Sequence, residues 1–80
     1  MQVTAVEPLE GRKLRLTFDD GSRRDVDLRP HLRGPVFERI AADRDYFLRV
    51  RVDPELGTIV WPNGADFCPD VLHSGRFPED

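Results

Sequence analysis

The sequence contains a single cysteine, Cys68, and no long run of apolar residues. One cysteine excludes an internal disulfide framework and is typical of proteins from a reducing compartment. The first residues lack the basic and apolar regions of a secretory signal, and no apolar run reaches the length needed to span a bilayer. We therefore expect a cytoplasmic protein that does not enter a membrane.

The motifs of common catalytic and metal sites are also missing. His31, Cys68 and His73 lie in three separate segments without the paired spacing of metal ligands. No glycine-rich phosphate loop follows a predicted strand, and no pair of carboxylates is placed in an apolar pocket by the sequence. We interpret Cys68 as a packing residue. These absences predict no catalytic residues, no metal and no cofactor, and a protein that is not an enzyme.

The chain has little lysine and no net positive charge. Lys13 is the only lysine among 12 basic residues, and the formal net charge is −3 with a pI near 5.3. This balance argues against a protein that binds nucleic acid over its whole surface, although a local basic patch is compatible with it. A chain of 80 residues, with 39% hydrophobic and 34% charged residues, is typical of one small folded domain.

Alternating apolar and polar residues predict five strands. The clearest is Lys13 to Phe18, in which Leu14 and Leu16 would face the core together with Phe18. Asp19-Asp20-Gly21 predicts a hairpin turn after it. The first strand would place Val3 and Ala5 on one face, with Val6 breaking the alternation. The other predicted strands are Gln2 to Leu9, Ser22 to Leu28, Tyr46 to Val52 and Thr58 to Trp61.

Two helical segments are predicted. Pro35 would open a helix through about Ala42, with Val36, Phe37, Ile40 and Ala41 on its buried stripe. Asp66 would cap a short helical turn through Leu72, with Pro69 in its first turn. The fold class is thus α+β, a mainly antiparallel β-meander sheet in the order β-β-β-α-β-β. One short helix covers one face, and a short helical turn closes the chain. We expect a single domain over residues 1–73 and a polar tail over 74–80.

The most distinctive stretch runs from Thr58 to Asp70 and contains the only Trp, Asn and Cys of the chain. It resembles a small bacterial family named domain of unknown function 2442. The matching segments are Phe18-Asp19-Asp20-Gly21, Val26-Asp27-Leu28, Val36-Phe37, Phe47, Val50-Arg51-Val52-Asp53 and Gly57-Thr58-Ile59-Val60-Trp61-Pro62-Asn63-Gly64-Ala65-Asp66, followed by Pro69-Asp70 and Leu72. The resemblance implies a compact α+β domain with a meandering antiparallel sheet, and it implies no known activity. Some members are encoded beside another small domain, which suggests a paired system of toxin–antitoxin type, and some carry a helix-turn-helix segment.

Two surfaces are candidate sites. The first is an interaction patch formed by Trp61, Asn63, Asp66 and Asp70, because a half-exposed Trp is a common interface anchor. The competing interpretation, which we favour, is that Trp61 lies in the core, Asn63-Gly64 forms a turn and Asp66 caps a helix. The second is a basic sheet face, which requires the hairpin strands and the fourth strand to be neighbours. Its residues would be Lys13, Arg15, Arg23, Arg49 and Arg51. A solvated face with cross-strand ion pairs is the alternative that we favour there.

Three functions are compatible with these observations. The leading hypothesis is a non-enzymatic interaction module that binds a small protein partner, or a second copy of itself, as an antitoxin-like or regulatory subunit. The alternative is a transcriptional regulator that binds nucleic acid through the basic face. The third is an enzyme or small-ligand binder with a pocket beside Trp61, and we rank it last.

Overall fold

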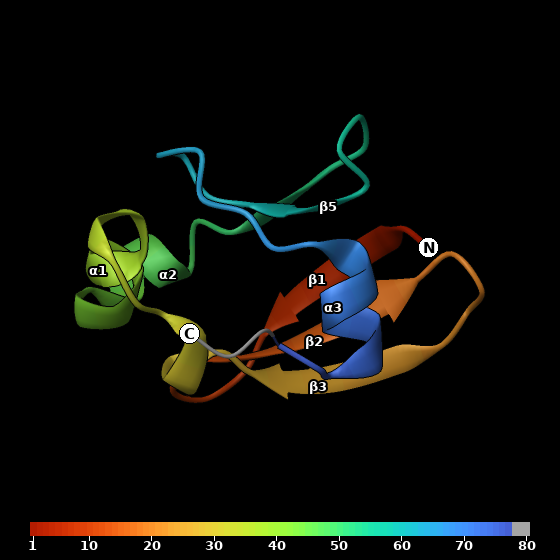
Figure 1. Ribbon diagram of the computed structural model, residues 1–80, viewed down its shortest axis with the longest axis horizontal. Helices are drawn as coiled ribbons and strands as arrows, with labels where there is room; N and C mark the ends of the chain where they lie inside the picture. Colours follow the sequence, from red (N-terminus) through yellow and green to blue (C-terminus); the bar gives the residue numbers. More distant parts are fainter. Residues whose placement is uncertain (78–80) are drawn as a thin grey trace.

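The first part of the chain forms a three-stranded antiparallel sheet in the computed structural model, which describes residues 1–77 (Figure 1). Its strands, in spatial order, are β1 (Val3–Pro8), β2 (Lys13–Phe18) and β3 (Arg23–Asp27). The alternation predicted for the central strand is confirmed, because its three apolar side chains are at most 1% exposed. Burying every second side chain in this way fixes the face of β2 that turns to the core.

The predicted hairpin turn between β2 and β3 is also confirmed. Gly21 has a φ of 85°, a conformation that side-chain-bearing residues rarely adopt. Its N–H donates to the carbonyl oxygen of Phe18 at 2.9 Å. Asp20 closes the loop, since its Oδ1 accepts from the N–H of Ser22 at 2.9 Å and from the hydroxyl of Ser22 at 2.6 Å. The turn chemistry is therefore local, which is why the sequence predicts it.

The first strand departs from the predicted pattern. Its register against β2 shifts between Val3 and Ala5. Such an irregularity reverses the alternation of side chains that follow it. Val3 is accordingly buried and Ala5 exposed, while Val6 is half-buried. The prediction that Val3 and Ala5 share a face is therefore wrong.

A second, two-stranded sheet is formed by β4 (Arg51–Asp53) and β5 (Thr58–Val60). All described strand pairs are antiparallel and the α+β class is confirmed, but the predicted meander is divided into two sheets. The junction lies at Gly57, whose carbonyl oxygen accepts from the N–H of Val3 at 2.9 Å. Gly57 has a φ of 69°, and a Cβ there would lie 2.9 Å from Cγ of Gln2. Only glycine allows the chain start to approach this closely.

Two helices lie where one helix and the start of a strand are predicted: α1 (Pro35–Ala42) and α2 (Arg44–Phe47). The predicted strand from Tyr46 to Val52 is wrong as far as Val50, since only Arg51 and Val52 of that range belong to β4. Asp43 is the reason, because its Oδ1 accepts from the N–H of Asp45 at 3.0 Å and of Tyr46 at 3.4 Å. This carboxylate ends one helix and caps the next. Val36, predicted to face the core, is 50% exposed on α1.

The chain closes with α3 (Pro69–Ser74), which lies over the three-stranded sheet (Figure 1). Leu72 is fully buried, and the ring of His73 meets the ring of Phe18 edge-on at 4.8 Å between centroids. Pro69 at the first helical position is as predicted. The capping role predicted for Asp66 is wrong, because the N-cap residue is Cys68 and no side chain caps the helix. The last three residues of the predicted tail lie outside the described residues.

A buried arginine joins the sheet to the helices. Arg12 is 9% exposed, and its Nε donates to the carbonyl oxygen of Ile40 at 3.0 Å and its Nη2 to that of Ala41 at 2.9 Å. Carbonyls at the end of a helix have no partner within the helix, so Arg12 satisfies two of them at the end of α1. Arg44 makes the return connection and donates to the carbonyl oxygens of Leu9 and Gly11. The turn between β1 and β2 is thus tied to α1 and α2 by two side chains.

Candidate functional site

The tryptophan of the predicted patch belongs to the core. Trp61 is 1% exposed, and its indole N–H donates to the carbonyl oxygen of Phe47 at 3.0 Å. The two rings lie 6.4 Å apart between centroids. A buried indole with a satisfied N–H contributes packing and presents no surface to a partner. The structure therefore supports the core interpretation of Trp61.

The other three residues of the patch are exposed, and they have separate environments. Asn63 organises the turn after β5, since its Oδ1 accepts from the N–H of Ala65 at 3.0 Å and its Nδ2 donates to the carbonyl oxygen of Val36 at 2.8 Å. The backbone of Asp66 forms an isolated bridge with Val60. Asp70 lies in the first turn of α3. Asn63 thus connects the turn after β5 to α1 by a hydrogen bond. Asp66 lies in the segment between β5 and α3.

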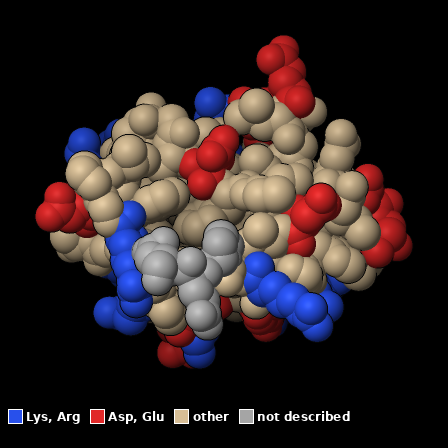
Figure 2. All heavy atoms as spheres, in the orientation of Figure 1, with Lys and Arg blue, Asp and Glu red and all other residues tan. Residues whose placement is uncertain are grey.

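The five residues of the predicted basic face do not share one face. Lys13, Arg15 and Arg23 lie on β2 and β3, whereas Arg51 lies on β4 in the other sheet and Arg49 precedes β4. The condition for that face, neighbouring strands, is not met. On the face shown in Figure 2, acidic side chains lie within the face as well as at its edge, and Lys and Arg side chains are scattered rather than gathered in one patch.

Arg15, at the middle of the first sheet, is engaged by carboxylates. Its Nε and Nη2 donate to Asp25 at 2.8 and 3.1 Å, and Glu7 lies 3.8 Å away. The hydrogen bonds from Arg15 lower the pKa of the Asp25 carboxyl below its ordinary value. This paired arrangement matches the alternative expectation of a solvated, cross-strand face.

The histidines and the cysteine are not brought together. Within residues 1–77 there is no group of three metal-ligating side chains. His73 has its Nε2 3.7 Å from Asp20, a carboxylate whose pKa is lowered mainly by its hydrogen bonds from Ser22. His31 stacks on Phe77 instead, and Cys68 is exposed. Every buried polar side-chain atom in the described part of the chain has a hydrogen-bond partner.

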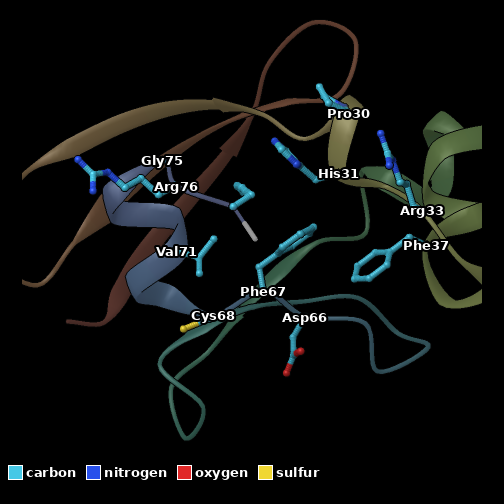
Figure 3. A pocket seen from close by; sticks show the side chains of 11 residues that line it. Pro30, His31, Arg33, Phe37, Asp66, Phe67, Cys68, Val71, Gly75 and Arg76 are labelled. Atoms are coloured by element: carbon cyan, nitrogen blue, oxygen red, sulfur yellow. The ribbon is translucent and has the colours of Figure 1, made fainter. Parts of the chain in front are cut away.

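A groove of about 970 Å³ lies between the end of α3 and a 3₁₀ turn, η1 (Arg29–His31), with α1 beside that turn (Figure 3). Its walls come from four segments far apart in the sequence: η1 with Arg33, the first turn of α1, the residues just before α3, and the end of α3 with the residues after it. A volume of this size is within the range of ligand-binding pockets.

Four rings line the groove. Phe37 and Phe67 lie 5.0 Å apart, and Phe67 meets Phe77 edge-on at 5.8 Å. His31 and Phe77 are stacked at 3.8 Å with 10° between their planes. We call these residues, His31, Phe37, Phe67 and Phe77, the open cluster. All four are half-buried, so aromatic surface remains available to a ligand.

Charged residues frame the open cluster. Arg33 lies beside η1 at one end of the groove and Arg76 at the other, beyond α3 (Figure 3). Asp66 also lines the groove, and in the same view its carboxylate points away from the rings. In the same view the side chain of Arg76 also extends away from the rings, so the floor of the groove is aromatic and its charged groups lie at the rim.

The sequence gives only a partial signal for this groove: Asp66, a residue of the predicted patch, lines it, but the meeting of the four rings is not predicted. Phe37 is predicted as part of a helix stripe, and Phe77 lies in the predicted tail. His31 is weighed only as a metal ligand. The rings come from segments that no local pattern connects, and only the packing of η1, α1 and α3 around the core brings them together.

The chain belongs to the family described as a protein of unknown function, DUF2442, whose model matches residues 3–78. The expected family is thereby confirmed over nearly the whole chain. No curated protein and no solved structure matches the chain significantly. No helix among the described residues is long and apolar enough to cross a membrane.

Proposed function

We propose that this protein is a non-enzymatic interaction module that binds a segment of a small protein partner in the groove of the open cluster. The observation that carries the proposal is the set of half-buried rings around His31 and Phe67 in an open groove of about 970 Å³. Aromatic residues in a concave surface are typical anchors of protein–protein interfaces. An antitoxin-like or regulatory subunit would use such a surface to hold its partner.

The chemistry of the groove supports binding rather than catalysis. Its lining includes one carboxylate, Asp66, whose side chain is averted, and one thiol, Cys68, which is exposed. His31 has its ring face covered by Phe77 at 3.8 Å. A general base and a nucleophile within hydrogen-bond reach of each other are the usual requirement for acid–base or covalent catalysis. The contacts of His31 and Cys68 described here do not supply such a pair.

Nucleic-acid binding through an arginine face has less support. The five basic residues considered for it are divided between two sheets and a connecting segment, and Arg15 is held by two carboxylates. A protein that neutralises several phosphates needs several available cations along one surface.

The single cysteine makes the proposal directly testable. A benzophenone maleimide attached to Cys68 would sit at the groove and, on irradiation, join the protein covalently to whatever occupies it. The matched control is Cys68→Ser with Glu55→Cys, which moves the same reagent to the exposed loop between β4 and β5. Both labelled proteins are incubated in a lysate of the source organism, with and without nuclease, and products are identified by mass spectrometry.

We expect one small protein, captured through Cys68 in stoichiometric amount, with or without nuclease, and not captured through the Glu55 position. Unlabelled protein in excess should suppress the capture. Equal products from both positions, or products lost on nuclease treatment, would contradict a groove-bound protein partner.

A further inference from the structure

Within residues 1–77, the strand β3 has one edge that pairs with no other strand (Figure 1). At the opposite edge of the three-stranded sheet, β1 meets the second sheet, where the N–H of Val3 donates to the carbonyl oxygen of Gly57 at 2.9 Å. A strand edge without a partner presents backbone donors and acceptors that can pair with a strand of another chain. The edge of β3 is therefore a surface on which a further strand fits.

The pairing with β2 shows which backbone groups of β3 face this edge. The N–H of Phe18 donates to the carbonyl oxygen of Ser22 at 2.9 Å, and the N–H of Leu28 donates to that of Arg12 at 3.0 Å. Hydrogen-bonded pairs recur at every second residue of an antiparallel ladder. The even-numbered residues of β3 are thus bonded to β2, and the backbone groups of the odd-numbered residues point to the edge.

The odd-numbered residues are Arg23, Asp25 and Asp27, and all three are exposed. No backbone group among the described residues bonds to them at this edge. Asp25 is bound by Arg15 of the same chain at 2.8 and 3.1 Å. Arg23 and Asp27 form no ion pair within residues 1–77, although Asp27 accepts the N–H of Arg29 at 3.0 Å. The edge thus begins with a cation and ends with an anion, and neither has a counter-ion in that part of the chain.

We propose that two copies of this protein pair through β3 in antiparallel orientation, with Asp25 on the two-fold axis, so that their three-stranded sheets become one continuous sheet. In this register Arg23 of each copy lies opposite Asp27 of the other, and all the backbone groups that face the edge are paired. Opposite charges directly across two antiparallel strands stabilise the pairing. The two Asp25 carboxylates meet at the axis, and each keeps Arg15 of its own chain as a counter-ion.

The charges of β3 also select this register. A shift toward the hairpin turn would set Arg24 opposite its own copy and Asp27 opposite Gly21, while a shift the other way would set Asp25 opposite Asp27. Self-pairing goes beyond the proposed function, and it uses none of the residues that line the groove. Two strands of five residues form a small interface, so we expect a weak dimer.

The test is sedimentation velocity on the full-length protein from about 10 μM to about 1 mM, the range in which a weak dimer forms. The samples are the wild type, Arg23→Asp, Asp27→Arg and an equal mixture of these two variants. In each variant alone, like charges face each other at both ends of the paired strands. In the mixture, every facing pair is again opposite in sign. The control, Arg51→Asp, makes the same charge change as Arg23→Asp but lies on β4, and circular dichroism checks the folding of each variant.

We expect the wild type to dimerise and each variant alone to raise the dissociation constant at least about fivefold, because two favourable pairs become repulsive. The mixture should return to within about twofold of the wild type. The two substitutions change the net charge in opposite directions, so a loss that both share cannot come from net charge.

Amide hydrogen exchange of the wild type gives a second readout that needs no variant. The N–H groups of Arg23, Asp25 and Asp27 should exchange more slowly as the protein concentration rises, because they become paired in the dimer. A wild type that stays monomeric at about 1 mM, a mixture that associates no better than its components, or an equal loss in Arg51→Asp would overturn the inference.

Discussion

Two groups of aromatic residues lie side by side in this protein and differ in how far their rings are exposed to solvent. The closed cluster consists of Phe47 and Trp61 with the guanidinium of Arg12, which lies 5.4 Å from the Phe47 ring centre. The open cluster begins at Phe67, whose ring meets Trp61 at 6.1 Å. The rings of the closed cluster are at most 1% exposed, whereas those of the open cluster are all half-buried.

Polar groups make the difference between the two clusters. In the closed cluster the indole N–H and the guanidinium donate to backbone carbonyls, so the rings are fixed by hydrogen bonds as well as by burial. In the open cluster the described ring contacts are apolar or stacking contacts between segments that end or begin nearby. We infer that the first cluster carries stability and the second remains available for binding. The following predictions test that division.

The largest loss of stability is expected for a substitution at the centre of the closed cluster. Trp61→Ala should lower the free energy of unfolding by about 3–5 kcal/mol, because it leaves a cavity and removes the donor to Phe47. That loss is a large part of the stability of a domain this small. Urea unfolding followed by circular dichroism measures it, with Trp61→Phe as the variant that keeps one aromatic ring but loses the indole N–H and part of the ring volume. A loss below 1 kcal/mol for Trp61→Ala would erase the distinction between the clusters.

Arg12→Ala should cost about 2–3 kcal/mol, because two carbonyl oxygens at the end of α1 lose a charged donor. Arg12→Lys should recover little of this, since an ammonium cannot reproduce the planar fork that reaches both carbonyls. Arg23→Ala, on the exposed edge strand, is the control and should stay within about 0.5 kcal/mol. The same urea unfolding experiment applies. Equal losses for Arg12 and Arg23 would show that Arg12 is not part of the closed cluster.

Phe77→Ala should cost about 1 kcal/mol or less, although it removes a whole aromatic side chain, because the ring is only partly buried and its partners are surface rings. Proton NMR provides an independent measurement. The ring protons of His31 should shift downfield on loss of the stacked ring, while the indole N–H of Trp61 should keep its position. A loss comparable to that of Trp61→Ala would place Phe77 in the structural core.

The smallest change in stability is expected for a substitution on the solvent-facing side of the three-stranded sheet. The pKa of Asp25 is lowered in the folded protein, chiefly by its hydrogen bonds from Arg15. Its contribution to stability is therefore complete above the ordinary aspartate pKa of about 4 and is lost as the pH falls through the lowered folded value. Asp25→Asn should flatten the decrease in melting temperature as the pH falls below about 4. An unchanged acid profile would show that the pair contributes nothing measurable, as many exposed pairs do.

Local signals account for what the sequence predicted well. The alternation in Lys13–Phe18, the Asp19-Asp20-Gly21 turn and the start of helices at Pro35 and Pro69 each depend on residues within a few positions. The side chain of Asp43 is equally local, and its role could have been predicted. Asp43 directly follows the helix predicted through about Ala42, and the same aspartate that ends α1 also caps α2.

Other sequence-based predictions fail because they concern contacts between segments that are distant in the sequence. The shift at Val3 and Ala5 and the division into two sheets depend on how the chain start meets Gly57. The turn Glu10-Gly11-Arg12 looks unremarkable in sequence, and its arginine becomes a buried anchor only because the end of α1 lies against it. The domain limits at residues 73 and 74 stay a prediction, although Phe77 packs against the core.

The sequence by itself determined the α+β class, the family, the hairpin and the burial of every second residue in β2, because each follows from residue chemistry repeated at short range. Tertiary structure alone decided that His31, Phe37, Phe67 and Phe77 meet in a groove, and it settled the choice between a buried and an exposed Trp61 in favour of the buried one. The physical reason is that burial and ring contact depend on which segments pack against each other, and the residues of one segment do not specify its neighbour. These four residues lie on segments separated by up to 46 positions, from residue 31 to residue 77 (77 − 31), and they acquire a common environment only when the core beneath them has formed.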